Sequence, residues 1–258
     1  MKNKITLLFA VIPIMFIATS CIFMGPWVEG NGNVKEETRK TGEFNEIEVS
    51  RGMNVYITQG EITKVVVKAD ENLLEIIETR TDGDKLIVTA KQNIRRADSK
   101  KVFVTTPKIT EIKSSSGSNV YSESKIVSKD LELSTSSGSN MTLEIESENV
   151  DASASSGSNI KLQAKAKNLD SSASAGSNIR IAGTTNSFSA KVSSGANIKA
   201  KELISENCDL HASSGGNIWI TVNDELVAKA SSGGNVFYTG NPKSTNIENS
   251  SGGNVKKD

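Results

Sequence analysis

Aromatic residues, cysteine and histidine are scarce in this chain of 258 residues. Phe, Trp and Tyr together make up 5%, and the sequence holds two cysteines and a single histidine. So few aromatic side chains exclude a thick core of large residues, and the core must be narrow. Two cysteines exclude a disulfide framework, and one histidine without a second ligand at metal-binding spacing predicts no metal centre.

The chain also lacks an excess of either charge. Lys and Arg number 30, as do Asp and Glu, which gives a formal net charge of 0. No overall field therefore favours nucleic acid, and we expect no nucleic-acid partner.

The first 20 residues have the pattern of an export signal. Two lysines precede an apolar run over residues 5–17, which is too short for a comfortable transmembrane helix. The sequence Ala18-Thr19-Ser20-Cys21 is similar to a bacterial lipobox, so we predict a lipoprotein signal peptide over 1–20 and lipidation (palmitate) at Cys21. A plain signal peptide cut near Ser20 is the alternative. Residues 21–41 show no apolar period and are predicted to be a flexible tether.

The sequence Ser-Ser-Gly-x-Asn recurs eight times between residues 115 and 254, once with Ala as its second residue. Its glycines lie 21, 19, 19, 19, 20, 18 and 19 residues apart. Apolar or small residues alternate with polar ones on both sides of each copy, which is the strand pattern. One such unit cannot bury its own apolar face, whereas stacked units bury a continuous core. The repeat therefore predicts an all-β, single-stranded β-helix (a β-solenoid) with coils of about 19 residues over 111–255.

Residues 42–110 have strand patterns but lie outside the regular repeat. The segment from Ile47 to Ile57 is similar to a degenerate coil, Asp82-Gly83 between apolar runs predicts a hairpin, and residues 101–104 predict a strand. We expect this irregular, β-rich part to cap the N-terminal edge of the solenoid, whose strand groups would otherwise be unpaired. The predicted domain thus spans 42–255.

The turn residues have separate physical roles. Gly takes a positive φ without steric penalty, and Asn tolerates a left-handed backbone while its amide both donates and accepts. Asparagines of successive turns, once in register, can form a hydrogen-bonded side-chain ladder. The predicted ladder consists of Asn119, Asn140, Asn159, Asn178, Asn197, Asn217, Asn235 and Asn254.

One outward column follows the turn asparagines by two positions. Its members are Tyr121, Thr142, Lys161, Arg180, Lys199, Trp219, Phe237 and Lys256. Exposed aromatic rings stack on sugars, and neighbouring cations attract anionic substituents. We therefore take five of these residues as a candidate ligand-binding stripe, namely Lys161, Arg180, Lys199, Trp219 and Phe237. The alternative is that the two aromatic rings only pack on one another across coils, or lie under a loop.

A second outward column, which precedes the turns, is mostly acidic. Its members are Glu132, Asp151, Asp170, Ser189 and Asp209. A divalent cation would relieve the repulsion between these carboxylates, but solvent and nearby lysines screen it as well, and we predict no metal. The same alignment places His211 among outward residues and Cys208 among buried ones. No histidine is placed to activate any of the many serines, so we predict no catalytic residue and no cofactor.

The recurring Gly-x-Asn-[Ile/Val] turn, the opening Phe44-x-x-Ile47-x-Val49 and the segment Val55-x-Ile57-x-x-Gly60 resemble the putative autotransporter adhesin head (GIN) domain family. The resemblance covers residues 44–255. It implies a bacterial β-solenoid that is exported or lipid-anchored, and it brings no catalytic residues with it.

These observations together predict a non-catalytic lipoprotein of the bacterial cell envelope. We expect a lipid anchor in a membrane, at the outer membrane or cell surface, and a solenoid displayed for adhesion or for binding an extracellular glycan or protein. One alternative is a polysaccharide-processing β-helix enzyme, but such enzymes need convergent side chains in a groove and the acidic column is periodic. The other is a self-associating structural envelope protein. The sequence leaves the oligomeric state open.

Overall fold

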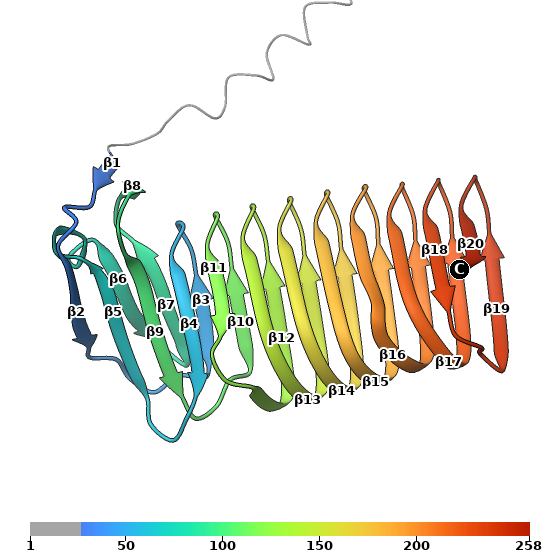
Figure 1. The fold of residues 1–258 in the computed structure, drawn as a ribbon, viewed down its shortest axis with the longest axis horizontal. Helices are drawn as coiled ribbons and strands as arrows, with labels where there is room; N and C mark the ends of the chain where they lie inside the picture. The colour runs from blue at the N-terminus through green and yellow to red at the C-terminus, as the bar shows by residue number, and fades with distance from the viewer. Residues whose placement is uncertain (1–26) are drawn as a thin grey trace, which may run out of the picture.

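The computed structural model describes residues 27–258, so the predicted signal peptide and Cys21 lie outside the described residues. The described chain forms a rod of stacked parallel coils with an irregular β-rich part at its N-terminal end (Figure 1). The predicted β-solenoid is therefore confirmed. Within 27–258 the single helix is a 3-10 turn, Glu71–Leu73, and no helix there is long and apolar enough to cross a membrane.

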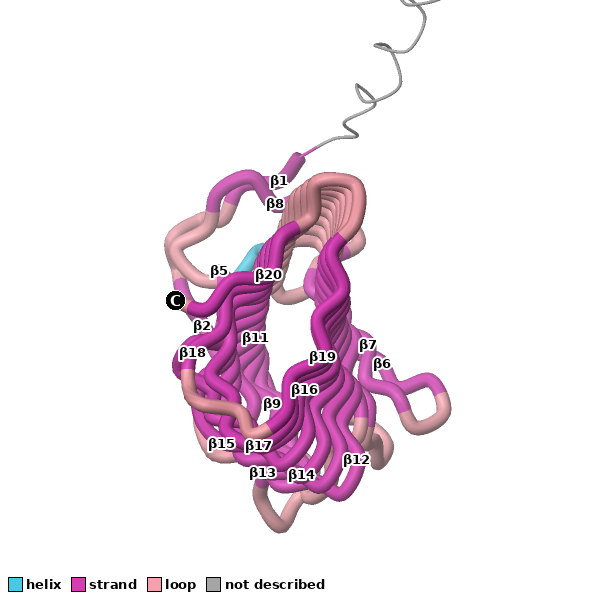
Figure 2. Tube along the Cα trace, turned by 90° about the vertical axis from the view of Figure 1, so that its right-hand side faces the viewer, coloured by secondary structure: helices cyan, strands magenta, loops and turns pink. Residues whose placement is uncertain are grey.

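In the middle of the regular part each long strand runs from one turn to the next, whereas the first and last coils are divided into shorter strands. Seen along the rod, each coil is an elongated loop with the tight turn at one end and a bend within the strand at the other (Figure 2). The strands are β10 (Glu111–Ser114), β11 (Asn119–Ser122), β12 (Ile126–Thr135), β13 (Asn140–Ala154), β14 (Asn159–Ala173), β15 (Asn178–Val192), β16 (Asn197–Ala212), β17 (Asn217–Ala230), β18 (Asn235–Thr239), β19 (Ser244–Asn249) and β20 (Asn254–Lys257). Each pairs in parallel with the same segment of the next coil, so equivalent residues stack in columns.

Alternation along each strand places one set of side chains inside the rod. Ile160, Ile179, Ile198 and Ile218 follow successive turns, stack in register and are no more than 2% exposed. Burying such a side chain stabilises the fold by roughly 1.5–3 kcal/mol. Small residues such as Ala190 and Ala228 lie inside as well, so the core is narrow, as the shortage of aromatic residues predicts.

The turns between strands require left-handed backbone at two consecutive residues. Ser156 has φ 52° and Gly157 has φ 70°, and Ser158 N donates to Ser155 O at 3.2 Å, which closes a turn of the I′ type. The sequence predicts positive φ at the glycine, and the turn asparagines, which also tolerate it, do not adopt it. The serine before it is the unexpected member, because a left-handed conformation costs a residue with a Cβ roughly 1–2 kcal/mol.

The N-terminal part completes the rod in an order that differs from the order along the chain. Its strands are β1 (Trp27–Glu29), β2 (Val34–Arg39), β3 (Glu46–Val49), β4 (Asn54–Gln59), β5 (Lys64–Asp70), β6 (Ile77–Asp82), β7 (Lys85–Ala90), β8 (Asn93–Arg96) and β9 (Lys100–Thr106). β3 and β4 form a coil that lies between β7 and β9 on one side and β10 and β11 on the other. The predicted degenerate coil, the β6–β7 hairpin and the strand at 101–104 are confirmed.

The prediction of a flexible tether over 21–41 is wrong from residue 27 onward. β2 pairs antiparallel with β5, and β1 pairs in parallel with β8. The buried Asp70 carboxylate fixes this segment, because it accepts hydrogen bonds from the backbone N–H groups of Gly32 at 3.0 Å and Ser99 at 2.9 Å. The segment lacks an apolar period because it is an edge strand with mostly exposed side chains, held by main-chain bonds.

Candidate functional site

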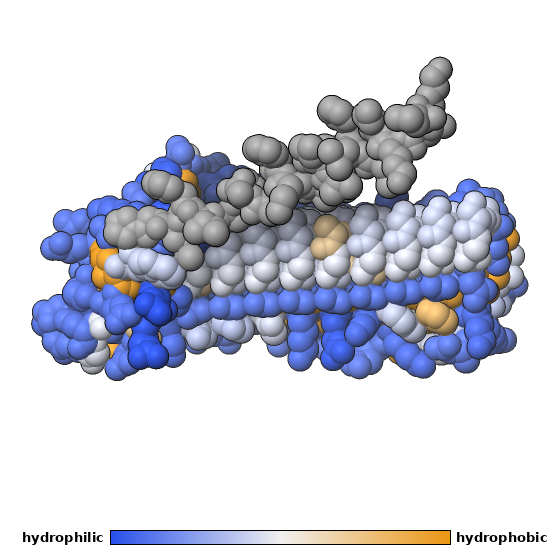
Figure 3. Space-filling view, turned by 90° about the horizontal axis from the view of Figure 1, so that it is seen from above, coloured by the Kyte–Doolittle hydropathy of each residue, from blue (hydrophilic) through white to orange (hydrophobic). Residues whose placement is uncertain are grey.

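The turn asparagines form a continuous side-chain ladder along one edge of the rod. In each step the Nδ2 of one asparagine donates to the Oδ1 of the asparagine one coil closer to the N-terminal part, over 2.8–3.2 Å. The linked residues are Asn54, Asn119, Asn140, Asn159, Asn178, Asn197, Asn217 and Asn235. Figure 3, a view onto the turns, shows a continuous hydrophilic line running along the regular part of the rod beside the paler ridge of the turns.

The two ends of this ladder differ from the predicted set. Asn54 of the degenerate coil belongs to it, because it stacks on Asn119 in the β4–β11 register. Asn254 stacks on Asn235 through the backbone, but its side chain makes no hydrogen bond to another residue of the described chain. A second, shorter ladder at the bend was not predicted: Asn168 donates to Asn149, which donates to Asp130. These ladders bond side chains to one another and are structural.

The five residues of the predicted stripe lie on consecutive coils of one face. The registers pair Lys161 with Arg180, Arg180 with Lys199, Lys199 with Trp219 and Trp219 with Phe237. The three cations are exposed, and the two aromatic side chains are partly exposed. Trp219 and Phe237 stack with ring centroids 5.3 Å apart and an angle of 14° between the rings. The packing across coils named as the alternative is thus present, and it leaves the rings partly open to solvent.

The column continues beyond Thr142 into a second group of aromatic rings. Tyr121 stacks on Tyr56 with centroids 5.3 Å apart, and Tyr56 stacks on Phe103 with centroids 5.2 Å apart. The ammonium of Lys101 lies over the Tyr56 ring at 5.6 Å. We call the whole column, from Phe103 to Phe237, the basic–aromatic stripe. Aligning Asn54 with the repeat asparagines would have found Tyr56, whereas Phe103 joins only because β9 pairs with β4.

The cations of the basic–aromatic stripe are free of carboxylate partners. No ion pair within 4.0 Å involves Lys161, Arg180 or Lys199 in the part of the chain that the structure describes. A hollow of about 380 Å³ is lined by Lys161 and Arg180 and also by Glu144 and Glu202, neither of which forms an ion pair with these cations within 4.0 Å. Cations one strand spacing apart repel one another, so a bound anion would stabilise this part of the stripe.

The acidic column lies before the turns in register, as its alignment predicts, but its members differ in environment. Glu132 has the ammonium of Lys113 at 3.9 Å, and Asp209 lies 3.1 Å from His211. Burial and, second, the neighbouring Asp170 carboxylate raise the pKa of Asp151. Among residues 27–258 no group of three or more potential ligands could hold a metal ion.

His211 and Cys208 lie where the alignment predicts them. His211 is in register with Lys191 and Lys229 on the outer surface and is partly exposed. Cys208 stacks between Phe188 and Leu226 inside the core, and burial raises the pKa of its thiol to about 12. The thiol is therefore protonated and unreactive at neutral pH.

The fold and its surface columns define a single-chain β-solenoid with a laddered turn edge and a basic–aromatic face. A family model described as "Putative auto-transporter adhesin, head GIN domain" matches residues 43–175 and 163–242. The chain belongs to this family, which confirms the resemblance that the turn motif indicates. Membership indicates a role in adhesion or binding, a non-enzymatic protein and a place at the cell surface or envelope.

Solved structures of similar fold come from Parabacteroides species. One from Parabacteroides distasonis, described as a putative lipid binding protein, has a TM-score of 0.81 at 20% identity and covers 90% of this chain and 100% of its own. One from Parabacteroides merdae, described as a putative adhesin, has a TM-score of 0.79 at 20% identity and covers 91% and 100%. At this identity the likeness shows the fold alone. No curated protein matches the sequence.

Proposed function

We propose that this protein is a non-catalytic, lipid-anchored envelope protein whose basic–aromatic stripe binds an acidic polysaccharide. The observation that carries this proposal is the arrangement of the stripe. Three cations without carboxylate partners, Lys161, Arg180 and Lys199, lie in register between two groups of stacked, partly exposed aromatic rings.

The length of the stripe favours a polymer over a small ligand. From Phe103 to Phe237 the stripe crosses nine consecutive coils. At roughly 4.8 Å per coil this is on the order of 40 Å. A surface of this length fits an extended chain whose sugar rings stack on the aromatic groups while its carboxylates or sulfates lie along the cations.

Binding to a panel of neutral and acidic polysaccharides tests the proposal. The triple variant Lys161→Gln, Arg180→Gln, Lys199→Gln should lose binding to the acidic members at least tenfold, together with most of its salt dependence. The double variant Trp219→Ala, Phe237→Ala should weaken binding roughly tenfold with the salt dependence retained.

A matched control removes three exposed lysines that lie outside the stripe. The variant Lys129→Gln, Lys167→Gln, Lys191→Gln loses the same number of charges and should bind like the unmodified protein. Equal losses in the stripe and control variants would mean that binding follows net charge only, and the stripe would not be the site.

The proposed anchor at Cys21 would hold the rod by its capped end. β1 lies at the end opposite to β19 and β20 (Figure 1), so the regular coils would extend away from the membrane. Cys21→Ser should release the protein from the membrane fraction into the soluble fraction and abolish incorporation of labelled palmitate. Retention of label by this variant would overturn the anchor, and it would leave the stripe proposal standing.

A further inference from the structure

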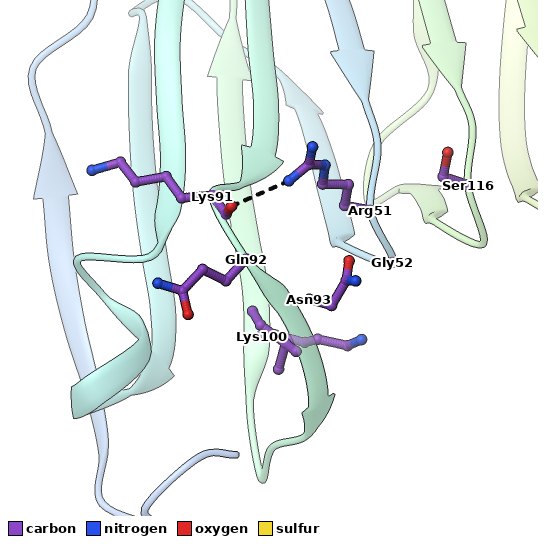
Figure 4. A pocket seen from close by; sticks show the side chains of 8 residues that line it. Arg51, Gly52, Lys91, Gln92, Asn93, Lys100 and Ser116 are labelled. Carbon is purple, nitrogen blue, oxygen red and sulfur yellow. Dashed lines mark hydrogen bonds between the residues drawn. The ribbon is translucent and has the colours of Figure 1, made fainter. Parts of the chain in front are cut away.

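A cationic cavity lies where the turn of the degenerate coil faces β8, away from the basic–aromatic stripe. Its volume is about 650 Å³, and its lining includes Arg51, Asn93, Lys100 and Ser116. Arg51, Asn93 and Lys100 lie around Gly52, and Lys91 and Gln92 also line the cavity, with side chains that extend away from the other three (Figure 4). The lining contains no Asp or Glu.

Arg51 is a large charged residue at a turn position that Ser or Ala holds in the other coils. Its position in the turn is taken in the other coils by Ser116, Ser137, Ser156, Ala175, Ser194, Ser214, Ser232 and Ser251, all with positive φ. Arg51 has φ 56°, so this one turn carries a large cation on a strained left-handed backbone. Its Nη1 donates to Ala90 O at 2.8 Å and Lys91 O at 3.3 Å, which fixes the guanidinium at the cavity.

Lys100 is the second cation of the cavity lining. A Cβ on Gly52 would lie 3.2 Å from Lys100 Nζ, so the glycine keeps open the space in front of the ammonium. Burial lowers the pKa of Lys100, and no carboxylate of the described chain pairs with Lys100 or Arg51 within 4.0 Å. Two cations and the Asn93 amide thus line one cavity that has no acidic lining residue.

We propose that this cavity binds a phosphate group carried by a larger polar molecule. A guanidinium and an ammonium beside neutral donors match the charge and the several oxygens of a phosphate. The cavity is much larger than a phosphate ion, so there is room for the sugar or glycerol that carries it. The carrier is a membrane phospholipid headgroup or a soluble sugar phosphate, and both present the same chemistry to Arg51 and Lys100.

The cavity lies near the start of the described chain, close to the proposed lipid anchor, so binding to a phospholipid headgroup is tested separately. β1 pairs with β8 so that Trp27 lies beside Asn93 and Val28 beside Ile94, which puts the cavity next to the start of the described chain. Cys21 precedes Trp27 by six residues, which span at most about 20 Å when extended. The closeness of the cavity to a membrane rests on the proposed anchor at Cys21. The measurement with a soluble sugar phosphate does not rest on it.

The test uses the chain from residue 21 onward, carrying Cys21→Ser. Calorimetry and amide NMR shifts are measured with inorganic phosphate, with glucose 1-phosphate, and with vesicles of phosphatidylcholine with or without phosphatidylglycerol. We expect saturable binding of glucose 1-phosphate or of the phosphatidylglycerol vesicles, with shifts at Gly52, Asn93 and Ser116. Binding of glucose 1-phosphate identifies a soluble carrier, and binding of the vesicles alone identifies a headgroup.

Two substitutions separate the cavity from general charge. Lys100→Gln should weaken binding roughly tenfold or more, and Lys108→Gln, at an exposed lysine outside the cavity lining, should change it less than twofold. Asn93→Ala provides a second loss variant, and a thermal melt confirms that each protein is folded. The proposal is overturned by absence of binding to all three probes at millimolar concentration, or by equal effects of Lys100→Gln and Lys108→Gln. The stripe variants should bind these probes normally, so this outcome and that of the polysaccharide test are independent.

Discussion

Asn178 lies in the middle of the asparagine ladder, so its substitution tests how much the ladder contributes to the free energy of unfolding. Its Nδ2 donates to Asn159 Oδ1 at 3.2 Å, and its Oδ1 accepts from Asn197 Nδ2 at 3.1 Å. Asn178→Ala removes both bonds. Asn178→Asp keeps the size of the side chain, but an ionised carboxylate only accepts, so two oxygens would face each other across the step to Asn159.

The expected magnitudes follow from these two bonds. A hydrogen bond of this kind contributes a net 0.5–1.5 kcal/mol, so Asn178→Ala should lower the free energy of unfolding by about 1–3 kcal/mol. In Asn178→Asp the protonated carboxyl can still donate to Asn159, so the folded state favours the neutral form and raises the pKa of this group above its unfolded value. Stability gained in this way is present below the unfolded pKa, at about 3.9, and is lost as pH rises through the folded pKa.

Thermal and urea unfolding at pH 3.5 and pH 7 measure both effects. Asn178→Ala should lower Tm by roughly 2–4 °C per kcal/mol, and Asn178→Asp should lose stability relative to the unmodified protein as pH rises from about 4 to 6. Asn254 is the matched control, because its side chain makes no hydrogen bond to another described residue. If Asn254→Ala costs as much as Asn178→Ala, or Asn178→Asp shows no such pH dependence, the ladder does not stabilise the rod.

Two further predictions concern the N-terminal part and the turns. Burial raises the pKa of the Asp70 carboxyl, but the hydrogen bonds that backbone N–H groups donate to it have the larger combined effect and leave the pKa below its ordinary value. The stability that the ionised Asp70 contributes is therefore lost as pH falls through that lowered pKa. The hydrogen-exchange protection factors of amides in β1 and β2 should therefore fall in acid, and Asp70→Asn should lower them already at pH 7, by removing about 1–3 kcal/mol of local stability. Gly157→Ala should cost roughly 1–2 kcal/mol from left-handed strain only, because its Cβ would meet nothing within 4 Å. Gly183→Ala should cost clearly more in the same urea titration, because its Cβ would lie 1.9 Å from the carbonyl oxygen of Ala164.

Much of the regular part could be predicted because its contacts repeat with the period of the sequence. In a parallel solenoid each residue stacks on its equivalent in the next coil, so alignment of the Ser-Ser-Gly-x-Asn copies is also an alignment in space. That is why Lys161, Arg180 and Lys199 were found as neighbours, and why Cys208 was placed in the core. The left-handed serine was missed because Ser has no preference for such a backbone, and only the closed turn imposes it.

The sequence by itself determined the coil length, the turn, and which side chains share a face, because strand alternation and a fixed period are local properties. Only the tertiary structure decided the order of strands in the N-terminal part, where the sequence has no regular period. β3 and β4 enter the stack between strands that follow them in the chain, and this order brings Phe103 onto Tyr56 and Lys100 in front of Gly52. Such contacts arise from pairing between segments of unrelated sequence. The N-terminal end of the rod, with its cationic cavity, therefore became visible only in the folded chain.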